Sequence, residues 1–408
     1  MIERARQPRP HRAARAAVAA LLAAALPFPS LADDAAPDTA VPAFANEVEA
    51  SLVRAIVGLR ESGLKHALGE IDVALSKTPN FRLGHLIRGD LLMARAGNPV
   101  AFGPKASVNA GLAPLQDEAR MRLQRYLDAP PRDSLPLPML RLAPTQAHAV
   151  LVDTSRSRLF VFANRDGEPR YVTDFYVSLG KNGVEKRREG DQKTPIGVYT
   201  IVAARQKLPE FYGPGAFPIS YPNEWDRLHG RKGHGIWLHG TPPETYSRPP
   251  RATDGCVALT NDDLQRLARY VDVGRTPVVI SEGIEWAAPE RWQESRREFL
   301  ATFEQWRADW ESRDVERYLA HYSPGFRAEG KDLAAWKARK RKVGAGKSWI
   351  KVGISDLSVF GQPEGEGMFV ATFTQDYRSS NLSNRTVKRQ YWAREGGRWR
   401  VVFETVIS

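Results

Sequence analysis

The spacing of apolar residues changes abruptly at a proline-rich segment, residues 130–146. Before it, apolar side chains recur three or four positions apart, as in Leu52, Ile56 and Leu59, which is the period of an amphipathic helix. After it, Val150 and Val152 alternate with other residues, which is the period of a strand. Because one element cannot satisfy both periods, the prolines indicate a domain boundary. We predict a helical module over 46–129, a linker over 130–146 and a mostly β domain over 147–283.

A second change of pattern begins near Pro289. Five aromatic residues share one face of an expected helix, and eight of the ten tryptophans follow residue 285. Three alternating segments then indicate long antiparallel strands: "SWIKVGISDLSVFG", "MFVATFTQDYRSS" and "TVKRQYWAREGGRWRVVFETVIS". We predict an α+β cone with an aromatic interior over 288–408, and hence a multidomain chain. The five aromatic residues are Trp292, Phe299, Phe303, Trp306 and Trp310.

The first 32 residues have the layout of a secretory signal peptide. Five arginines between Arg4 and Arg15 form a basic head, and the apolar run 16–26 is too short to span a bilayer. Ser30 and Ala32 form a small-x-small cleavage signal. We predict export to the periplasm with cleavage of 1–32, a flexible lead over 33–45, and no integral membrane span after cleavage. An uncleaved membrane anchor is the alternative.

Cys256 is the only cysteine. In an oxidising compartment cysteines usually pair, so a single one is either a small core residue or a reactive thiol. The net charge of +12 favours an anionic surface as partner, and an anionic cell envelope fits an exported chain better than a nucleic acid. We find no zinc-ligand clustering, phosphate loop or nucleotide fingerprint, and predict neither a metal nor a cofactor.

A histidine that could activate this thiol lies seventeen residues upstream. Ile236 and Leu238 alternate as a strand that ends at His239, and a proline-rich loop separates it from Cys256. A thiol becomes a good nucleophile when a neighbouring base takes its proton. Gly255 allows close approach of the backbone, and amides around Cys256 could stabilise an oxyanion.

These residues belong to a set of motifs that resembles the YkuD-type L,D-transpeptidase domain. The set comprises "GKNG" at 180–183, "KTPIG" at 193–197, "HG" at 239–240 and "DGC" at 254–256. The resemblance implies a β-rich catalytic domain that acts on peptidoglycan stem peptides through an acyl-enzyme. It assigns Cys256 as nucleophile, His239 as general base, the Gly240 carbonyl as the group that orients the imidazole, and Gly255 with Cys256 as the oxyanion site. Candidate substrate-binding residues are Arg251, whose guanidinium suits a carboxylate, and Trp237, Thr241 and Tyr221.

Two positions depart from the usual family motif. Asp254 stands where a histidine precedes Gly-Cys, and Ala258 replaces a basic or amide residue. Unless it turns away or pairs with a cation such as Arg251, Asp254 discourages ionisation of the thiol. Hydrolysis is therefore an alternative to transpeptidation, as in an L,D-carboxypeptidase or an amidase that releases peptidoglycan-linked lipoprotein. A catalytically weak peptidoglycan-binding module is an alternative of another class.

The flanking regions suggest further partners. Residues 288–408 resemble the NTF2/SnoaL-like cone, and L,D-carboxypeptidases that influence cell shape combine such a cone with a YkuD domain. The basic run 331–347 fits anionic envelope polymers, although such runs are usually solvated. The helical module resembles one tetratricopeptide-type unit, which suits packing, spacing or recruitment of divisome or elongation proteins. His229 and His234 are alternative bases, and Tyr212, Tyr221 and Trp225 form either a lid or ordinary packing.

Overall fold

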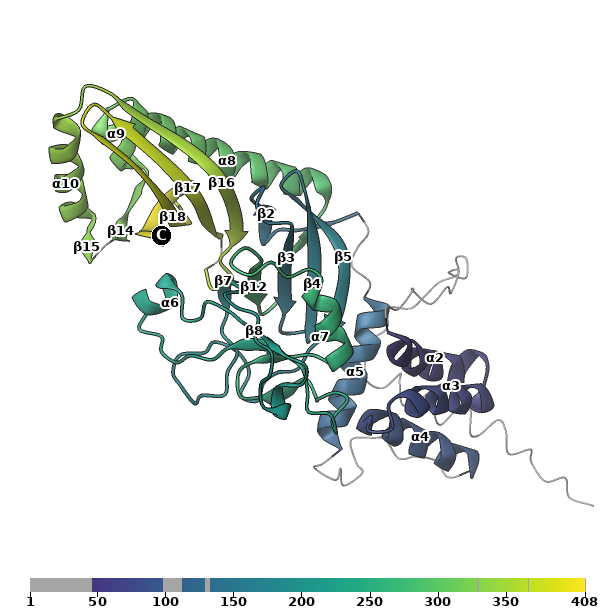
Figure 1. Ribbon diagram of the computed structural model, residues 1–408. Helices are drawn as coiled ribbons and strands as arrows, with labels where there is room; N and C mark the ends of the chain where they lie inside the picture. Colours follow the sequence, from purple (N-terminus) through teal and green to yellow (C-terminus); the bar gives the residue numbers. More distant parts are fainter. Residues whose placement is uncertain (1–45, 98–111, 129–132, 329, 366, 408) are drawn as a thin grey trace, which may run out of the picture. The chain divides into compact units, whose positions relative to one another are not determined.

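The structure, a computed structural model, describes residues 46–97, 112–128, 133–328, 330–365 and 367–407 (Figure 1). It divides into two compact units. The first comprises the described residues up to Asp128 together with 241–250 and 260–263, and the second comprises the remaining described residues. The expected signal peptide and flexible lead lie outside the described residues. Within the described ranges, no helix combines the length and apolarity needed to cross a membrane.

The first unit is helical, as its apolar period predicts. Asn46 caps the first helix by accepting a hydrogen bond from the Val48 amide, and residues 78–81 separate the second helix from the third. Its core includes the fully buried side chains of Leu52 and Ile71. The helices are α2 (Glu47–Glu61), α3 (Leu64–Lys77), α4 (Arg82–Arg95) and α5 (Ala113–Leu127).

Residues 241–250, which lie between His239 and Cys256 in the sequence, pack within this helical unit. The Tyr246 hydroxyl accepts a hydrogen bond of 3.0 Å from Asn46 Nδ2, and its ring meets the Phe81 ring edge-on at 4.8 Å. Ser247 Oγ donates to the buried Glu118 carboxylate at 2.6 Å. The helical unit therefore anchors the loop between the two motifs.

A five-stranded sheet in the order β5-β4-β3-β12-β7 forms the centre of the β domain. The expected strand around Val150 and Val152 pairs as a hairpin with residues 158–163. Asp153 Oδ1 accepts from the amides of Ser155 and Arg156 and closes the turn. The strands are β3 (His148–Asp153), β4 (Arg158–Arg165), β5 (Glu168–Tyr176), β7 (Gly197–Thr200) and β12 (Pro277–Ser281).

Short strands beside the central sheet position the motifs. Two small sheets have the orders β11-β9-β8 and β10-β6. Their strands are β6 (Leu179–Gly180), β8 (Ala216–Pro218), β9 (Trp237–His239), β10 (Arg251–Thr253) and β11 (Val257–Ala258). The helical elements of this region are η1 (Glu210–Tyr212), α6 (Glu224–Leu228) and α7 (Asn261–Ala268).

The segment predicted as a linker contains two strands and is not a bare connection. β1 (Leu135–Pro136) pairs with β13 (Trp286–Ala287), and β2 (Met139–Arg141) extends the sheet of the C-terminal domain by pairing with β16 (Ile350–Gly361). Met139 and Leu140 are almost fully buried there. Edge pairing with residues more than 200 positions away overrides the local proline signal.

The C-terminal domain is the expected α+β structure, with one long helix against a curved sheet (Figure 1). Its sheet has four long strands rather than the three predicted, because Gly396 and Gly397, both with positive φ, turn the last segment into a hairpin. The helices are α8 (Pro289–Glu311), α9 (Val315–Ala320) and α10 (Leu333–Ala345). The further strands are β14 (Tyr322–Ala328), β15 (Lys331–Asp332), β17 (Met368–Ser379), β18 (Leu382–Glu395) and β19 (Arg398–Val406).

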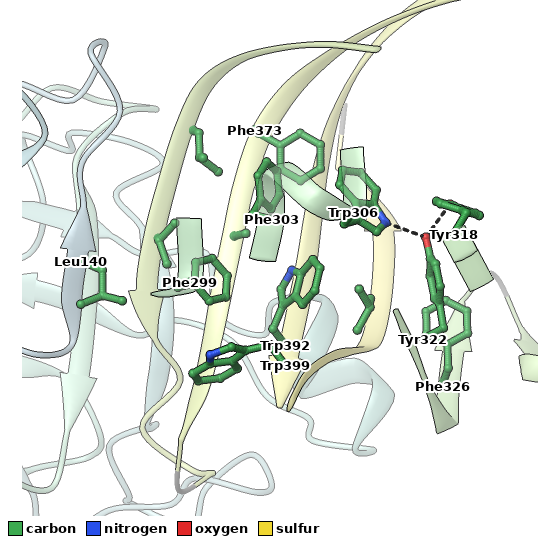
Figure 2. Close-up of a cluster of buried hydrophobic side chains, with 14 of the residues drawn as sticks. Leu140, Phe299, Phe303, Trp306, Tyr318, Tyr322, Phe326, Phe373, Trp392 and Trp399 are labelled. Atoms are coloured by element: carbon green, nitrogen blue, oxygen red, sulfur yellow. Dashed lines mark hydrogen bonds between the residues drawn. The ribbon is translucent and has the colours of Figure 1, made fainter. Parts of the chain in front are cut away.

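Aromatic side chains fill the interior of this domain, as the clustering of tryptophans predicts. Figure 2 shows Phe299, Phe303 and Trp306 of α8 against side chains of the sheet. The Trp306 indole donates to the Tyr322 hydroxyl at 3.3 Å, so the ring nitrogen of this buried residue keeps a partner.

Candidate active site

Two neighbouring parallel strands bring the cysteine and histidine motifs together. β11, which begins directly after Cys256, pairs with β9, which ends at His239. Ala258, two residues after Cys256, is the register partner of His239, and the Leu259 amide donates to the His239 carbonyl at 2.9 Å. The two residues therefore lie two register positions apart on adjacent strands, although seventeen positions separate them in the sequence.

His239 is held in one orientation. Its side chain is buried, and Nδ1 lies 2.6 Å from the Gly240 carbonyl oxygen. Because a carbonyl can only accept, Nδ1 carries the proton, and Nε2 is the ring nitrogen that can take one. The Tyr212 ring meets the imidazole edge-on at 5.2 Å, and the Tyr212 carbonyl accepts from the Gly240 amide at 3.1 Å. This arrangement fits the predicted role of His239 as general base.

Cys256 is partly exposed, and its Sγ lies 3.3 Å from the Gly235 carbonyl oxygen, to which the thiol donates. The preceding Gly255 has a φ of +127°, and a side chain there would place Cβ 2.7 Å from the Lys193 carbonyl oxygen. Glycine is therefore required on both conformational and steric grounds. The backbone thus fixes the position of the thiol.

Gly255 makes a hydrogen bond within the turn that carries Cys256. Its amide donates to Thr253 Oγ1 at 3.1 Å, and that hydroxyl donates to the Cys256 carbonyl at 2.7 Å. Thr253 is buried and ties the two sides of the turn together. The predicted oxyanion role of Gly255 and Cys256 stays a prediction, and within it Gly255 would act through the shape of the turn.

Asp254 has a cationic partner, but it is not Arg251. Lys181 Nζ lies 3.0 Å from Asp254 Oδ1, and Gln192 Nε2 donates to the same oxygen at 2.9 Å. The Lys181 amide also donates to the Thr253 carbonyl at 2.8 Å, beside the parallel pairing of β6 with β10. The lysine therefore offsets the negative charge that the departure from the motif introduces next to Cys256.

The loop that carries Gln192 is anchored by Asp191. Burial opposes ionisation of this carboxyl, but backbone amides of Arg188, Arg187 and Lys193 and the Lys186 ammonium donate to it and lower its pKa to about 2. Asp191 therefore remains charged at neutral pH and holds this loop beside the "DGC" motif.

The four predicted substrate-binding residues fall into two groups. Arg251 is exposed at the start of β10, and Trp237 is half-buried between the Tyr212 ring at 4.9 Å and the Arg205 guanidinium at 5.2 Å, so both stay candidates. Thr241 and Tyr221 are buried, and their role as substrate contacts stays a prediction.

The hydroxyl groups of Thr241 and Tyr221 both donate hydrogen bonds to backbone carbonyls. The Thr241 hydroxyl donates to the Thr245 carbonyl at 2.6 Å. The Tyr221 hydroxyl donates to the Lys232 carbonyl at 3.1 Å, while its ring packs against Tyr199 at 6.0 Å. Both side chains therefore hold loops in place.

The two alternative bases have other partners. The His229 ring bonds to the Trp225 carbonyl through Nδ1 at 2.9 Å, and His234 lies 3.2 Å from Glu189 on the surface. His239 stays the best-placed base. Sequence reasoning missed the roles of Lys181 and Gly235. Lys181 lies inside the recognised "GKNG" motif, which was a usable signal, whereas nothing in the sequence marks the Gly235 carbonyl.

A second candidate site is a cavity of about 220 Å³ in the C-terminal domain. Three lysines line it, Lys340, Lys347 and Lys388, together with tryptophans and tyrosines. The Lys340 ammonium lies 4.3 Å from the centroid of the Trp336 ring and 5.0 Å from that of Trp310. Asp309 and Asp314 also line the cavity, and Lys388 is paired with the buried Glu404 at 2.6 Å, so the lining is aromatic with charges of both signs.

Among the described residues, no three His, Cys, Asp or Glu side chains gather closely enough to hold a metal ion.

A β-rich domain with a histidine and a cysteine on adjacent strands, joined to an NTF2-like α+β domain, defines the class of protein. Residues 147–280 match the L,D-transpeptidase catalytic domain family, and residues 298–405 match the Cds6 C-terminal NTF2-like domain family. The chain thus carries an L,D-transpeptidase-type catalytic domain over 147–280, followed by an NTF2-like domain over 298–405.

Particular relatives agree with this assignment. YafK of Escherichia coli strain K12, to which an L,D-transpeptidase activity is ascribed, is 33% identical over 107 residues. That match covers 26% of this chain and only 39% of YafK. Bd1075 of Bdellovibrio bacteriovorus superposes with a TM-score of 0.59 at 28% identity, over 67% of this chain and 98% of that one. The helical cell shape determining protein Pgp2 of Campylobacter jejuni gives 0.57 at 26%, over 70% and 98%.

Proposed function

We propose that the protein is a cysteine L,D-transpeptidase that acts on peptidoglycan stem tetrapeptides through an acyl-enzyme at Cys256. The observation that carries the proposal is the hydrogen bond from His239 Nδ1 to the Gly240 carbonyl. It selects the tautomer in which Nε2 is basic, on the strand beside Cys256. A positioned imidazole is what converts a thiol into a nucleophile near neutral pH.

In the first half-reaction, Nε2 of His239 takes the thiol proton and Sγ attacks the carbonyl carbon of the third stem residue at its L-centre. The oxygen becomes an oxyanion beside the backbone at Gly255 and Cys256. When the tetrahedral species collapses, the bond to the nitrogen of the terminal D-amino acid breaks, and His239 returns the proton to that amine. A thioester on Cys256 remains, and one difficult step has become two easier ones.

In the second half-reaction an acceptor attacks the thioester carbonyl carbon, and His239 takes the proton of that acceptor. The bond from that carbon to Sγ of Cys256 then breaks, and His239 returns the proton to the sulfur, which regenerates the thiol. An amine of another stem peptide gives a crosslink, whereas water gives a tripeptide. The pairing of a YkuD domain with an NTF2-like domain favours the second candidate, an L,D-carboxypeptidase, because that combination occurs in trimming enzymes that influence cell shape. Arg251 and Trp237 are the more accessible of the four proposed contacts to the stem peptide, because Thr241 and Tyr221 are buried.

Other parts of the chain support an exported role. The basic head and apolar run of residues 1–32 would direct export, and peptidoglycan lies outside the inner membrane in an envelope with a periplasm. We expect the lysine-lined cavity of the C-terminal domain to bind an anionic group of the same polymer. We further propose that the helical unit recruits proteins of cell division or elongation.

The test is product analysis by mass spectrometry after incubation with a disaccharide tetrapeptide, alone and with a D-amino acid or second muropeptide. A 3–3 crosslinked dimer or an exchanged D-amino acid establishes transpeptidation. Tripeptide as the sole product assigns the carboxypeptidase instead. An untouched tetrapeptide, an untouched lipoprotein-linked muropeptide and no acylation by a carbapenem would together sink the enzymatic proposal in favour of a binding module.

A further inference from the structure

Helix α6 connects the NTF2-like domain to the candidate active site. The Trp225 ring on this helix stacks on the Tyr391 ring of β18, with centroids 4.5 Å apart and planes 17° from parallel. Tyr391 is fully buried and is therefore a fixed surface for the stack. The Trp225 indole also donates to Glu364, which lies between β16 and β17, at 3.2 Å. Residues far apart in sequence thus hold one short helix.

Ion pairs hold both ends of the same helix. Glu224 at its start lies 3.0 Å from the Arg389 guanidinium, which is largely buried. Beyond its end, Arg231 lies 3.0 Å from the buried Asp226 and 2.6 Å from Glu364. Partly buried pairs such as these are screened less by salt than surface pairs. The helix is therefore fastened to the sheet at three points.

The segment that follows Arg231 reaches the Cys256 thiol at Gly235. Gly235 follows Arg231 by four positions, and its carbonyl accepts the hydrogen bond from Cys256 Sγ at 3.3 Å. Lys232, between them, is also fixed, since its amide donates to the Arg187 carbonyl at 2.9 Å. Arg231 and Lys232 therefore hold the chain a few positions before the Gly235 carbonyl.

We infer that the contacts of α6 with the NTF2-like domain position the Gly235 carbonyl against the Cys256 thiol, so that this domain sets the reactivity of the nucleophile. Glu364, Arg389 and Trp225 are positioning residues, because each acts through α6 and the loop after it. A carbonyl that accepts from a neutral thiol favours that protonated form. The inference rests on the proposed function for its importance in catalysis, but the effect on the thiol is measurable without turnover.

The experiment measures the rate of iodoacetamide alkylation against pH by intact mass, on the full chain. Because Cys256 is the only cysteine, every adduct reports on it. In Glu364→Ala the loop is released, so we expect alkylation at pH 7 to be about threefold faster and the midpoint of the pH profile to fall by about half a unit. Glu364→Gln, which keeps an acceptor, should lie between this variant and the wild type. Turnover of tetrapeptide by Glu364→Ala should show a lower kcat with little change in KM.

A matched control tests whether any lost ion pair in this sheet has the same effect. Asp376 pairs with Arg378 at 2.9 Å on the exposed part of β17, and Asp376→Ala should leave the alkylation profile unchanged. Arg389→Gln releases the other end of α6 and should shift the midpoint in the same direction as Glu364→Ala. If one of these two variants does not fold, as judged by its thermal melt, the other decides. Every variant retains the charged and titratable groups of the site: His239, Asp254, Lys181, Arg251, His234 and Glu189.

The outcomes separate this inference from the proposed function. An unmoved midpoint in both Glu364→Ala and Arg389→Gln overturns the inference even if the wild type turns over tetrapeptide. A higher alkylation rate at high pH with an unchanged midpoint also overturns the inference. Such a result would mean that the exposure of the thiol has changed, and not its hydrogen bond to the Gly235 carbonyl. A shifted midpoint in a protein that forms no acyl-enzyme supports the positioning role and contradicts the proposed function.

Discussion

The Lys181 ammonium lies 3.0 Å from the Asp254 carboxylate, two residues before Cys256. Both side chains are substantially exposed, so the pair is screened by solvent, but it is close to the candidate nucleophile. It shows how this chain accommodates an acidic residue at a motif position where the family usually has a histidine.

Lys181→Gln removes the cation and leaves the Asp254 charge near the thiol. A nearby negative charge disfavours the thiolate, so we expect the pKa of Cys256 to rise and its alkylation at pH 7 to slow by about twofold to threefold. Adding Asp254→Asn should restore the rate. Equal slowing in the single and double variants would show that Lys181 acts by another route.

Gly255→Ala tests the backbone requirement beside the thiol. The new Cβ would lie 2.7 Å from the Lys193 carbonyl oxygen, in a backbone with φ of +127°. Gly274→Ala is a matched control, because its φ is +81° but nothing lies within 4 Å. We expect Gly255→Ala to cost about 1–3 kcal/mol more than the control in denaturant unfolding. Equal costs would mean that the turn can relax.

Arg122→Met should destabilise the helical unit. The Arg122 guanidinium is buried between the carboxylates of Glu49 and Glu118, and it lies 3.0 Å from the latter. Removing one partner leaves buried charge without compensation, which costs about 3–5 kcal/mol. Arg120→Met breaks only an exposed pair with Asp117 on the same helix and should cost at most about 1 kcal/mol. Comparable melting temperatures for the two variants would contradict this account.

Glu118 should make the stability of the helical unit fall as pH rises. Burial raises the pKa of Glu118 from its ordinary value of 4.5, although Arg122 opposes the rise. The folded unit therefore binds this proton more tightly than the unfolded chain. The resulting stability is fully present below about 4.5 and is lost as pH rises through the folded-state pKa. In Arg122→Met the pKa should rise further, so its melting temperature should gain more than that of the wild type between pH 8 and pH 5.

Lys340→Gln should weaken binding to isolated peptidoglycan sacculi. Lys340 lines the cavity of the C-terminal domain beside Trp336, where its charge can meet an anionic group. We expect about threefold to tenfold weaker binding in a cosedimentation assay. Lys337→Gln is the control, because it makes the same charge change on α10 at a residue outside the cavity lining. Equal weakening by both would indicate a diffuse surface effect.

The sequence predicted the elements whose patterns are local. Periodic apolar residues marked the helices of the first unit and α8, and alternation marked the strands of the β domain. It could not place β2 in the C-terminal sheet, because that pairing depends on residues more than 200 positions away. The hairpin at Gly396 was overlooked although two glycines mark it.

The site shows the same division. Cys256 and His239 could be named because few residue types supply a nucleophile and a base, and their motifs are short. The burial of Thr241 and Tyr221 could not be predicted, because burial is decided by tertiary packing, which no neighbouring residue reveals. The contact of the Gly235 carbonyl with Cys256 could not be predicted, because every residue has a backbone carbonyl and residue identity does not indicate which one accepts a hydrogen bond.

The central claim is that Cys256 becomes acylated with His239 as its base. Its most direct test is intact-mass detection of a covalent adduct after rapid mixing with a disaccharide tetrapeptide, in wild type, Cys256→Ala and His239→Gln. We predict an adduct with the mass of the disaccharide-tripeptide acyl group on the wild type, none on Cys256→Ala, and formation at least about a hundredfold slower on His239→Gln. An adduct on Cys256→Ala, or turnover of tetrapeptide by that variant at the wild-type rate, would contradict the account.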